Sequence, residues 1–402
     1  MSTQPSHPLN FSEIVPRLKG DDLWEYDCGS KGHCESVADE VFQALQRPSD
    51  FPPMGAAIVS GDRVAIAVDP NTPQVAEVLR GALNAVRATE ASDIDVVVGD
   101  EATEETLAEI KQVAGDVVRV IRHQPSDRES LRYLGADAAA HPIYLNRALV
   151  DADFVLPIVV GRPKDESGLL DGTGIFPFYS DACSRARFFQ SDEPAEEAPS
   201  DPSEPAWLLG VQIMMSVTPN NEGTVGEVTA GTPEAIQKLR KTARRAPDGF
   251  PPPAKLVIAS LDGSMQQQTW QNAARAIAAA ARYCEPSGTI VLWSQIKEEP
   301  SGSLAGISEG DGPVHESIPP AEGEFPTWDP KINPARTLGR IGNDYRILVH
   351  ASIEGELIEA LGLGWIENAE ELANLTASHD SCGVLRAAQF AGDAVDALPR
   401  TP

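Results

Sequence analysis

The stretch RVAIAVDPNTPQVAEVLRGALNAVRATEASDIDVVVGD, residues 63–100, decides the fold. It opens with a short apolar, β-branched run at 63–69, which is typical of a buried parallel strand. Apolar residues then recur every three or four positions over 74–87, and this spacing predicts an amphipathic helix. A second apolar run at 94–100 predicts another strand. Strand, helix and strand in this order indicate an α/β fold with parallel strands.

The same alternation continues along the chain. In the first half we expect helices at 35–45, 102–113 and 144–149, with strands at 116–121 and 154–161. In the second half we expect strands at 255–260 and 288–294, a long helix from about 266 to 283 and a helix at 353–361. The pattern predicts an α/β protein of two domains, each a mostly parallel sheet flanked by helices. A ligand cleft is expected between the domains, at the carboxyl ends of the strands.

The expected organisation has three parts. Residues 1–34 form an N-terminal arm, residues 35–250 a first α/β domain and residues 251–402 a second one. Within the first domain, residues 191–206 hold six acidic residues and four prolines in sixteen positions. So polar a segment cannot form a packed core, and we expect a solvated loop there.

Charge and composition narrow the class of partner. The chain has 60 acidic and 32 basic residues, a net charge of −28, which disfavours nucleic acid and anionic lipid by repulsion. No run approaches the roughly 18 apolar residues of a membrane helix, and the first residues lack the pattern of a secretory signal. Five scattered cysteines are typical of reduced thiols. We therefore expect a cytoplasmic protein whose partner is a small molecule.

Five motifs, in order, resemble those of the nickel-pincer lactate racemases. They are VAIAVDPNTP (64–73), RHQPSDRESLRYLG (122–135), HPIYLNRALVDADFVLPIVVGRPKDESGLLDGTG (141–174), SLDGSMQQQTWQNAARAI (260–277) and CEPSGTIVLWS (284–294). The resemblance implies an isomerase that racemises or epimerises a 2-hydroxy acid or a related hydroxy compound. It also implies a nickel-pincer nucleotide cofactor, tethered to a lysine and ligated by a histidine.

The resemblance assigns roles to particular residues. Racemisation by hydride transfer needs a base on each face of the substrate carbon. His123 falls on one base position, and Lys164 falls where the family has a second histidine. Asp69 is expected to have an orienting role in the site, and Gln271 is expected to contact cofactor or substrate. The ligand-binding set expected from the sequence is Asp69, Thr72, Arg162, Gly172, Gly174 and Gln271.

Other positions depart from the family's pattern. Gly174 falls at or beside the position where the family has its tether lysine. No histidine occurs between His141 and His315. Thr72 and Ala274 replace the arginine and lysine that would seat a substrate carboxylate. We therefore assign no metal ligand. A distant histidine (His315, His350 or His379) supplying one from the other domain stays an open alternative.

The residues themselves also allow simpler interpretations. A lone histidine after a strand, like His123, is often a satisfied structural residue, and Lys164 is flanked by acids in a solvated-looking loop. Arg162 and Lys164 together could seat an anion at the end of a strand. The glycines at 172 and 174 could bring backbone amides to a phosphate, although a plain turn fits equally well.

Two functional hypotheses follow. The first is a racemase or epimerase of the lactate racemase type. The second is a divergent member that no longer racemises and instead binds a small anion or a nucleotide, or serves as a regulatory scaffold. The sequence leaves the substrate and the oligomeric state open.

Overall fold

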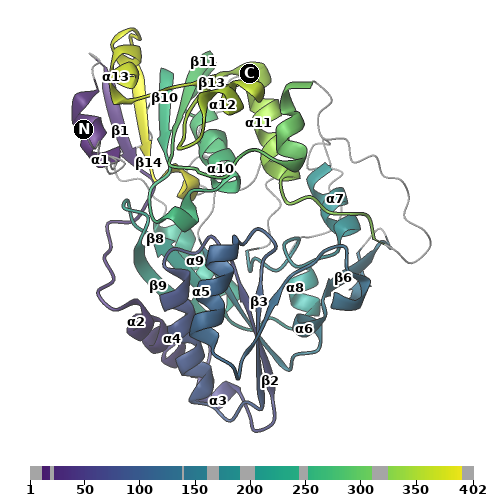
Figure 1. Ribbon diagram of the computed structural model, residues 1–402. Helices are drawn as coiled ribbons and strands as arrows, with labels where there is room; N and C mark the ends of the chain where they lie inside the picture. The colour runs from purple at the N-terminus through teal and green to yellow at the C-terminus, as the bar shows by residue number, and fades with distance from the viewer. Residues whose placement is uncertain are drawn as a thin grey trace, which may run out of the picture.

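The computed structural model describes residues 11–18, 22–137, 140–160, 172–190, 204–243, 252–309 and 325–391. The protein is an α/β protein with two domains, each built on a mostly parallel sheet flanked by helices (Figure 1). This is the fold class that the sequence predicts.

The first domain contains a six-stranded sheet in the order β4-β3-β2-β7-β8-β9. Its strands are β2 (Arg63–Val68), β3 (Asp93–Val98), β4 (Arg119–Arg122), β7 (Phe154–Val160), β8 (Met214–Pro219) and β9 (Val225–Gly231). All neighbours are parallel except β8 and β9. The predicted amphipathic helix at 74–87 is α4 (Val75–Arg87), which buries its apolar stripe against one face of the sheet.

Helices cover both faces of this sheet. One face carries α2 (Val37–Gln46), α4, and α5 (Glu104–Ala114), whose first turn is capped by Thr103. The other face carries α6 (Arg147–Val150), α8 (Glu204–Leu208) and a small antiparallel pair, β5 (Leu131–Ala136) and β6 (Pro142–Asn146). The remaining helices of this half are α3 (Met54–Ala57), α7 (Ala182–Gln190) and α9 (Pro233–Ala243).

The second domain contains a six-stranded, all-parallel sheet in the order β1-β14-β10-β11-β12-β13. Its strands are β1 (Leu23–Asp27), β14 (Cys382–Arg386), β10 (Ala254–Ser260), β11 (Cys284–Trp293), β12 (Arg346–His350) and β13 (Gly364–Trp365). On one face pack α10 (Trp270–Ala281), α11 (Ile332–Asp344) and α12 (Gly355–Ala360), and on the other α1 (Phe11–Ile14) and α13 (Ala369–Ala377).

Three sequence expectations differ from this structure. Residues 23–27, expected in an arm, form β1, which pairs with β14 because Trp24 and Tyr26 pack against Tyr283 (purple beside yellow in Figure 1). Residues 142–146, expected to be partly helical, form β6. The helix starts only at 147, where the Asn146 side chain accepts a hydrogen bond from the Ala148 N–H.

The long helix expected from 266 is also shorter than predicted. It begins at Trp270, because Thr269 is extended and accepts a hydrogen bond from the Asn272 N–H as the N-cap. Of the acidic loop expected at 191–206, residues 191–203 lie outside the described residues. Residues 204–206 begin α8. The domain boundary expected at residue 250 stays a prediction.

The order of strands reverses once in each sheet, and these two places face each other. The reversal lies between β2 and β7 in the first sheet, and between β10 and β14 in the second. Val160, which ends β7, packs against Ala387 and Phe390, which follow β14. Open parallel sheets bind ligands at such reversals, at the carboxyl ends of the strands. The fold therefore places the candidate site at the junction between the domains.

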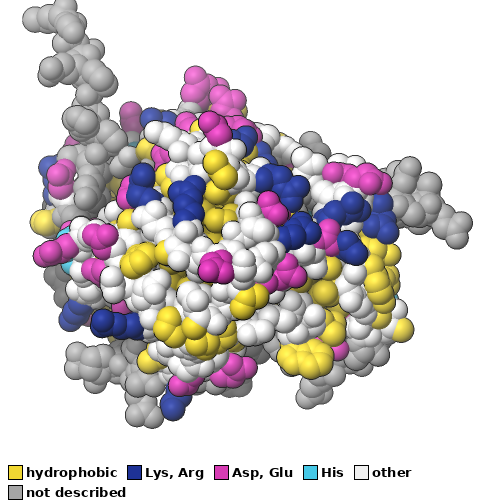
Figure 2. All heavy atoms as spheres, turned by 90° about the horizontal axis from the view of Figure 1, so that it is seen from below, with side chains coloured by type: hydrophobic (Ala, Val, Ile, Leu, Met, Phe, Trp, Pro, Cys, Tyr) yellow, Lys and Arg dark blue, Asp and Glu magenta, His cyan; other side chains and the backbone are white. Residues whose placement is uncertain are grey.

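The surface seen from below the first domain shows basic, acidic and apolar side chains interspersed (Figure 2). None of the described helices is both long and apolar enough to cross a membrane.

Candidate functional site at the strand ends

The predicted residues Asp69 and His123 lie at the carboxyl ends of β2 and β4, the two strands that flank β3 in the first sheet. Asp69 follows β2 and donates its N–H to the carbonyl of Ile158 in β7. His123 follows β4 and donates its N–H to the carbonyl of Val98 in β3. Parallel pairing thus extends by one residue beyond each strand, which fixes the backbone of both residues at the edge of the sheet.

His123 is 1% exposed, and both of its ring nitrogens form hydrogen bonds. Nε2 lies 2.9 Å from the carbonyl oxygen of Ser180, which can only accept, so Nε2 carries the proton. Nδ1 lies 3.3 Å from the side-chain Nδ2 of Asn146 and accepts its hydrogen. Burial, together with the positive charge of Arg185, lowers the pKa of His123 well below its usual value. His123 is therefore a neutral imidazole whose two nitrogens are both occupied.

Tyr179 fills the space beside this imidazole. Its ring centroid lies 5.8 Å from that of His123, and its hydroxyl donates to the carbonyl of Val68 at 2.7 Å. The side chain is buried in the core below β2. An aromatic residue thus connects the end of β2 with the end of β4.

A buried ion pair lies at the end of β3. Nη1 of Arg185, in α7, donates to Oδ2 of Asp100 at 2.8 Å, with side-chain exposures of 3% and 9%. Nη2 of Arg185 donates to the carbonyl of Phe178. Burial raises the pKa of Asp100, although Arg185 opposes this. The sequence analysis did not identify Arg185, because nothing in its local sequence marks it and Asp100 is 85 residues away.

The loop after β2 is held by its own side chains. Oδ1 of Asp69 accepts a hydrogen bond from the Asn71 N–H at 2.9 Å. Thr72, at the position where the family resemblance places an arginine, is fully buried, and its hydroxyl has no hydrogen-bond partner. Thr72 therefore lies inside the packed loop and presents no cation.

The start of α10 joins this loop to the second domain. Nε2 of Gln267 donates to the carbonyl of Asn71 at 2.9 Å, and Arg275 forms an ion pair with Glu101 at 2.9 Å. Gln271 lies in the first turn of α10, between Gln267 and Arg275 in the sequence, and is 5% exposed. Its side chain forms no hydrogen bond with another described residue. Its amide is thus uncommitted at the junction between the domains.

The two described glycines of the predicted phosphate turn have different constraints. Gly174 has a φ of +71°, and a Cβ there would lie 2.5 Å from Cγ1 of Val159. At Gly172 a Cβ would meet only the flexible end of Gln237, at 2.9 Å. Packing against β7 accounts for Gly174 without any ligand. Arg162 and Lys164 lie outside the described residues.

The described residues do not fit the cofactor that the resemblance implies. Gly174 and its neighbours Thr173 and Ile175 offer no amine for a covalent tether. Among the parts of the chain that the structure describes, no three or more His, Cys, Asp or Glu side chains gather as metal donors. His350 stacks on Trp293 and donates from Nδ1 to the carbonyl of Ile366. Within the described part of the chain, these positions therefore provide neither the tether nor a cluster of metal donors for a nickel pincer.

Comparisons with known proteins give one family-model match and two similar folds. A family model described as the lactate racemase N-terminal domain matches residues 26–162. The fold is similar to that of the lactate racemase apoprotein from Thermoanaerobacterium thermosaccharolyticum (TM-score 0.70, 14% identity, 93% of this chain and 94% of that chain). It is also similar to a protein from Thermotoga maritima (TM-score 0.58, 11% identity, 91% and 99% covered). No curated protein matches the sequence. The family resemblance stated from the motifs is confirmed.

Proposed function

Residues 26–162 match the lactate racemase N-terminal domain, and from that premise we propose that the chain is a lactate racemase-like protein that binds a small ligand at the junction of its domains without racemising a 2-hydroxy acid. One observation carries the proposal: both ring nitrogens of His123 are committed to buried hydrogen bonds. A general base must offer a lone pair within reach of the proton that it removes. Here the Nδ1 lone pair faces Asn146, and Nε2 carries a proton.

The absence of the two cations that would hold a substrate carboxylate supports the same proposal. A carboxylate is best held by charge-assisted hydrogen bonds from arginine or lysine. Thr72 and Ala274 occupy those two positions, and both are buried. Neither can supply a charge, so a substrate carboxylate would need a different anchor.

Retention of a ligand site is supported by the architecture. The two strand-order reversals face each other through Val160 and Ala387. Gln271 keeps an amide without a hydrogen bond to another described residue at this junction. We propose that the ligand is a small anion or a nucleotide, and that Arg162 and Lys164 contribute to its binding.

The racemase or epimerase is the second candidate, and the family match favours it. In that case His123 would have to exchange its Asn146 hydrogen bond for the substrate hydroxyl, and Lys164 would act as the opposite base.

The test is to express the chain together with the enzymes that make the pincer cofactor, beside a lactate racemase loaded in the same host. We expect an unmodified intact mass, no stoichiometric nickel and no conversion of L-lactate to D-lactate, while the control enzyme is active. Racemisation by this chain above the rate of its His123→Ala variant would overturn the proposal.

A further inference from the structure

Arg185 is a buried cation at the junction of the domains that no sequence motif marks. It lies in α7, whose first turn is held by Asp181: the carboxylate accepts hydrogen bonds from the backbone N–H of Ser184 at 3.0 Å and from its hydroxyl at 2.6 Å. The Arg185 residue is 3% exposed and reaches the carboxyl end of β3. Its charge also acts on His123, at the end of β4.

The guanidinium is only partly satisfied. It has five N–H donors, of which one from Nη1 bonds Asp100 and one from Nη2 bonds the carbonyl of Phe178. The Nε–H is buried and has no hydrogen-bond partner. An unpartnered buried donor costs about 1–3 kcal/mol, and more when it belongs to a charged group. Such an atom in a folded protein calls for an acceptor, such as an oxygen of a bound ligand.

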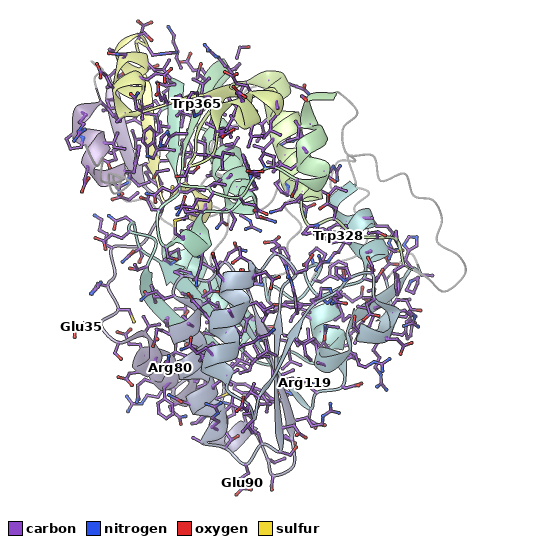
Figure 3. All side chains as sticks on the ribbon, viewed as in Figure 1. Glu35, Arg80, Glu90, Arg119, Trp328 and Trp365 are labelled. Carbon is purple, nitrogen blue, oxygen red and sulfur yellow. The ribbon has the colours of Figure 1, made fainter. Side chains whose placement is uncertain are left out.

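The second domain fixes the plane of this guanidinium. Its carbon Cζ lies 5.3 Å from the ring centroid of Trp328, a cation–π contact (Trp328 is labelled in Figure 3). Trp328 is held in turn by Ser126, whose hydroxyl accepts from the Trp328 N–H at 2.9 Å and donates to the carbonyl of Pro326 at 2.6 Å. With one face covered by the indole, the N–H groups at the edge of the guanidinium remain as donors.

The local charge favours a single negative charge on the ligand. Asp100 already balances Arg185, and His123 is neutral. A monocarboxylate would bring one extra charge into this buried site, whereas a phosphate dianion would bring two at a much larger desolvation cost.

We propose that Arg185 anchors the carboxylate of a small organic acid, and so replaces the two cations absent at Thr72 and Ala274. This inference rests on the proposed function, because it assumes a ligand site at the junction. Asp100 competes with the ligand for the guanidinium. Removing the Asp100 charge should therefore strengthen binding, which a purely structural ion pair does not predict.

The experiment is isothermal titration of the full chain at pH 7 with sodium L-lactate, glycolate and inorganic phosphate as probes. Wild type should bind the carboxylates. Asp100→Asn, which keeps the shape and a hydrogen-bond acceptor, should bind them about tenfold more tightly. The double variant Asp100→Asn/Arg185→Gln should lose binding. The double variant leaves no buried unpaired charge, so circular dichroism and melting should show a folded protein.

Arg187→Gln is the matched control, since it removes the same charge two positions along α7, where the side chain bonds Ser184 and the carbonyl of Pro142. It should bind as wild type does. Equal binding by the double variant and wild type would overturn the role of Arg185 and leave the proposed function standing. Binding of phosphate alone would also overturn it. No binding of any probe would overturn it as well.

Discussion

The side-chain amide of Asn146 donates to Nδ1 of His123 at 3.3 Å, and it does so inside the protein, where both residues are 1% exposed. The same Asn146 side chain caps α6 through its oxygen. One amide therefore fixes both the start of a helix and the tautomer of the histidine. This arrangement is typical of a structural network, in which each polar group satisfies another.

Truncating the histidine should cost stability. His123→Ala leaves Asn146 and the carbonyl of Ser180 buried without their partner and removes the contact with Tyr179. We expect the free energy of unfolding to fall by about 2–4 kcal/mol in urea titrations. His33→Ala, at an exposed site, is the control and should change it by less than about 0.5 kcal/mol. An equally stable His123→Ala would contradict the structural role.

The lowered pKa of His123 predicts a dependence of stability on pH. The unfolded chain binds a proton at this residue below about pH 6.5, while the folded state excludes it. Stability is therefore fully present above pH 6.5 and falls as the pH is lowered, by at most about 1.4 kcal/mol per unit. The slope between pH 6.5 and 5 should be smaller in His123→Gln than in wild type. Identical slopes would show that His123 titrates normally.

Variants of Thr72 test whether its hydroxyl is only packed inside the loop or contacts the ligand. The hydroxyl is buried without a hydrogen-bond partner, so the isosteric Thr72→Val should raise the free energy of unfolding by about 1 kcal/mol. Thr72→Ser, which keeps the hydroxyl, should give no such gain. If Thr72→Val instead abolishes ligand binding while Thr72→Ser retains it, the hydroxyl contacts the ligand.

Gly174 should resist substitution for two reasons, positive φ and contact with Val159. Gly174→Ala should lower the free energy of unfolding by about 2–4 kcal/mol. Gly210 has a φ of +73° with nothing within 4 Å of a Cβ, so Gly210→Ala measures the backbone term alone, about 1 kcal/mol. Adding Val159→Ala should restore part of the loss at Gly174. A Gly174→Ala as mild as Gly210→Ala would rule out the close contact.

The ion pair between Glu101 and Arg275 should couple the domains. Its side chains are 12% and 17% exposed, so a double-mutant cycle to Gln should give a coupling energy of about 1–3 kcal/mol. The pair of Glu77 and Arg80, exposed on α4, is the control and should give at most about 0.5 kcal/mol (Arg80 is labelled in Figure 3). Equal couplings would mean that the interdomain pair is solvated.

The fold could be predicted where local patterns are strong. β2, α4 and β3 follow from apolar runs and helical spacing. β1 could not be predicted, because its five residues, LWEYD, include two acids and it forms only by pairing with β14 at the other end of the chain. Its tertiary contacts override its composition.

The site was predicted less completely. Motif positions identified Asp69, Thr72 and His123 after the strands of the first sheet and Gln271 on α10, but not what each contacts. Ser180 is 57 residues from His123, and Arg185 is 85 residues from Asp100. Such partners are determined by packing, and no local spacing signals them. The networks that decide whether His123 is a base are therefore visible only in the structure.

The most direct test of the account is the protonation state of His123, measured by nitrogen-15 NMR of histidine-labelled protein, with the signal assigned by loss in His123→Gln. The account predicts one neutral tautomer with the proton on Nε2, unchanged between pH 5.5 and 8. A ring that titrates near pH 6.5, or that carries its proton on Nδ1, would contradict it and return His123 to the position of a catalytic base.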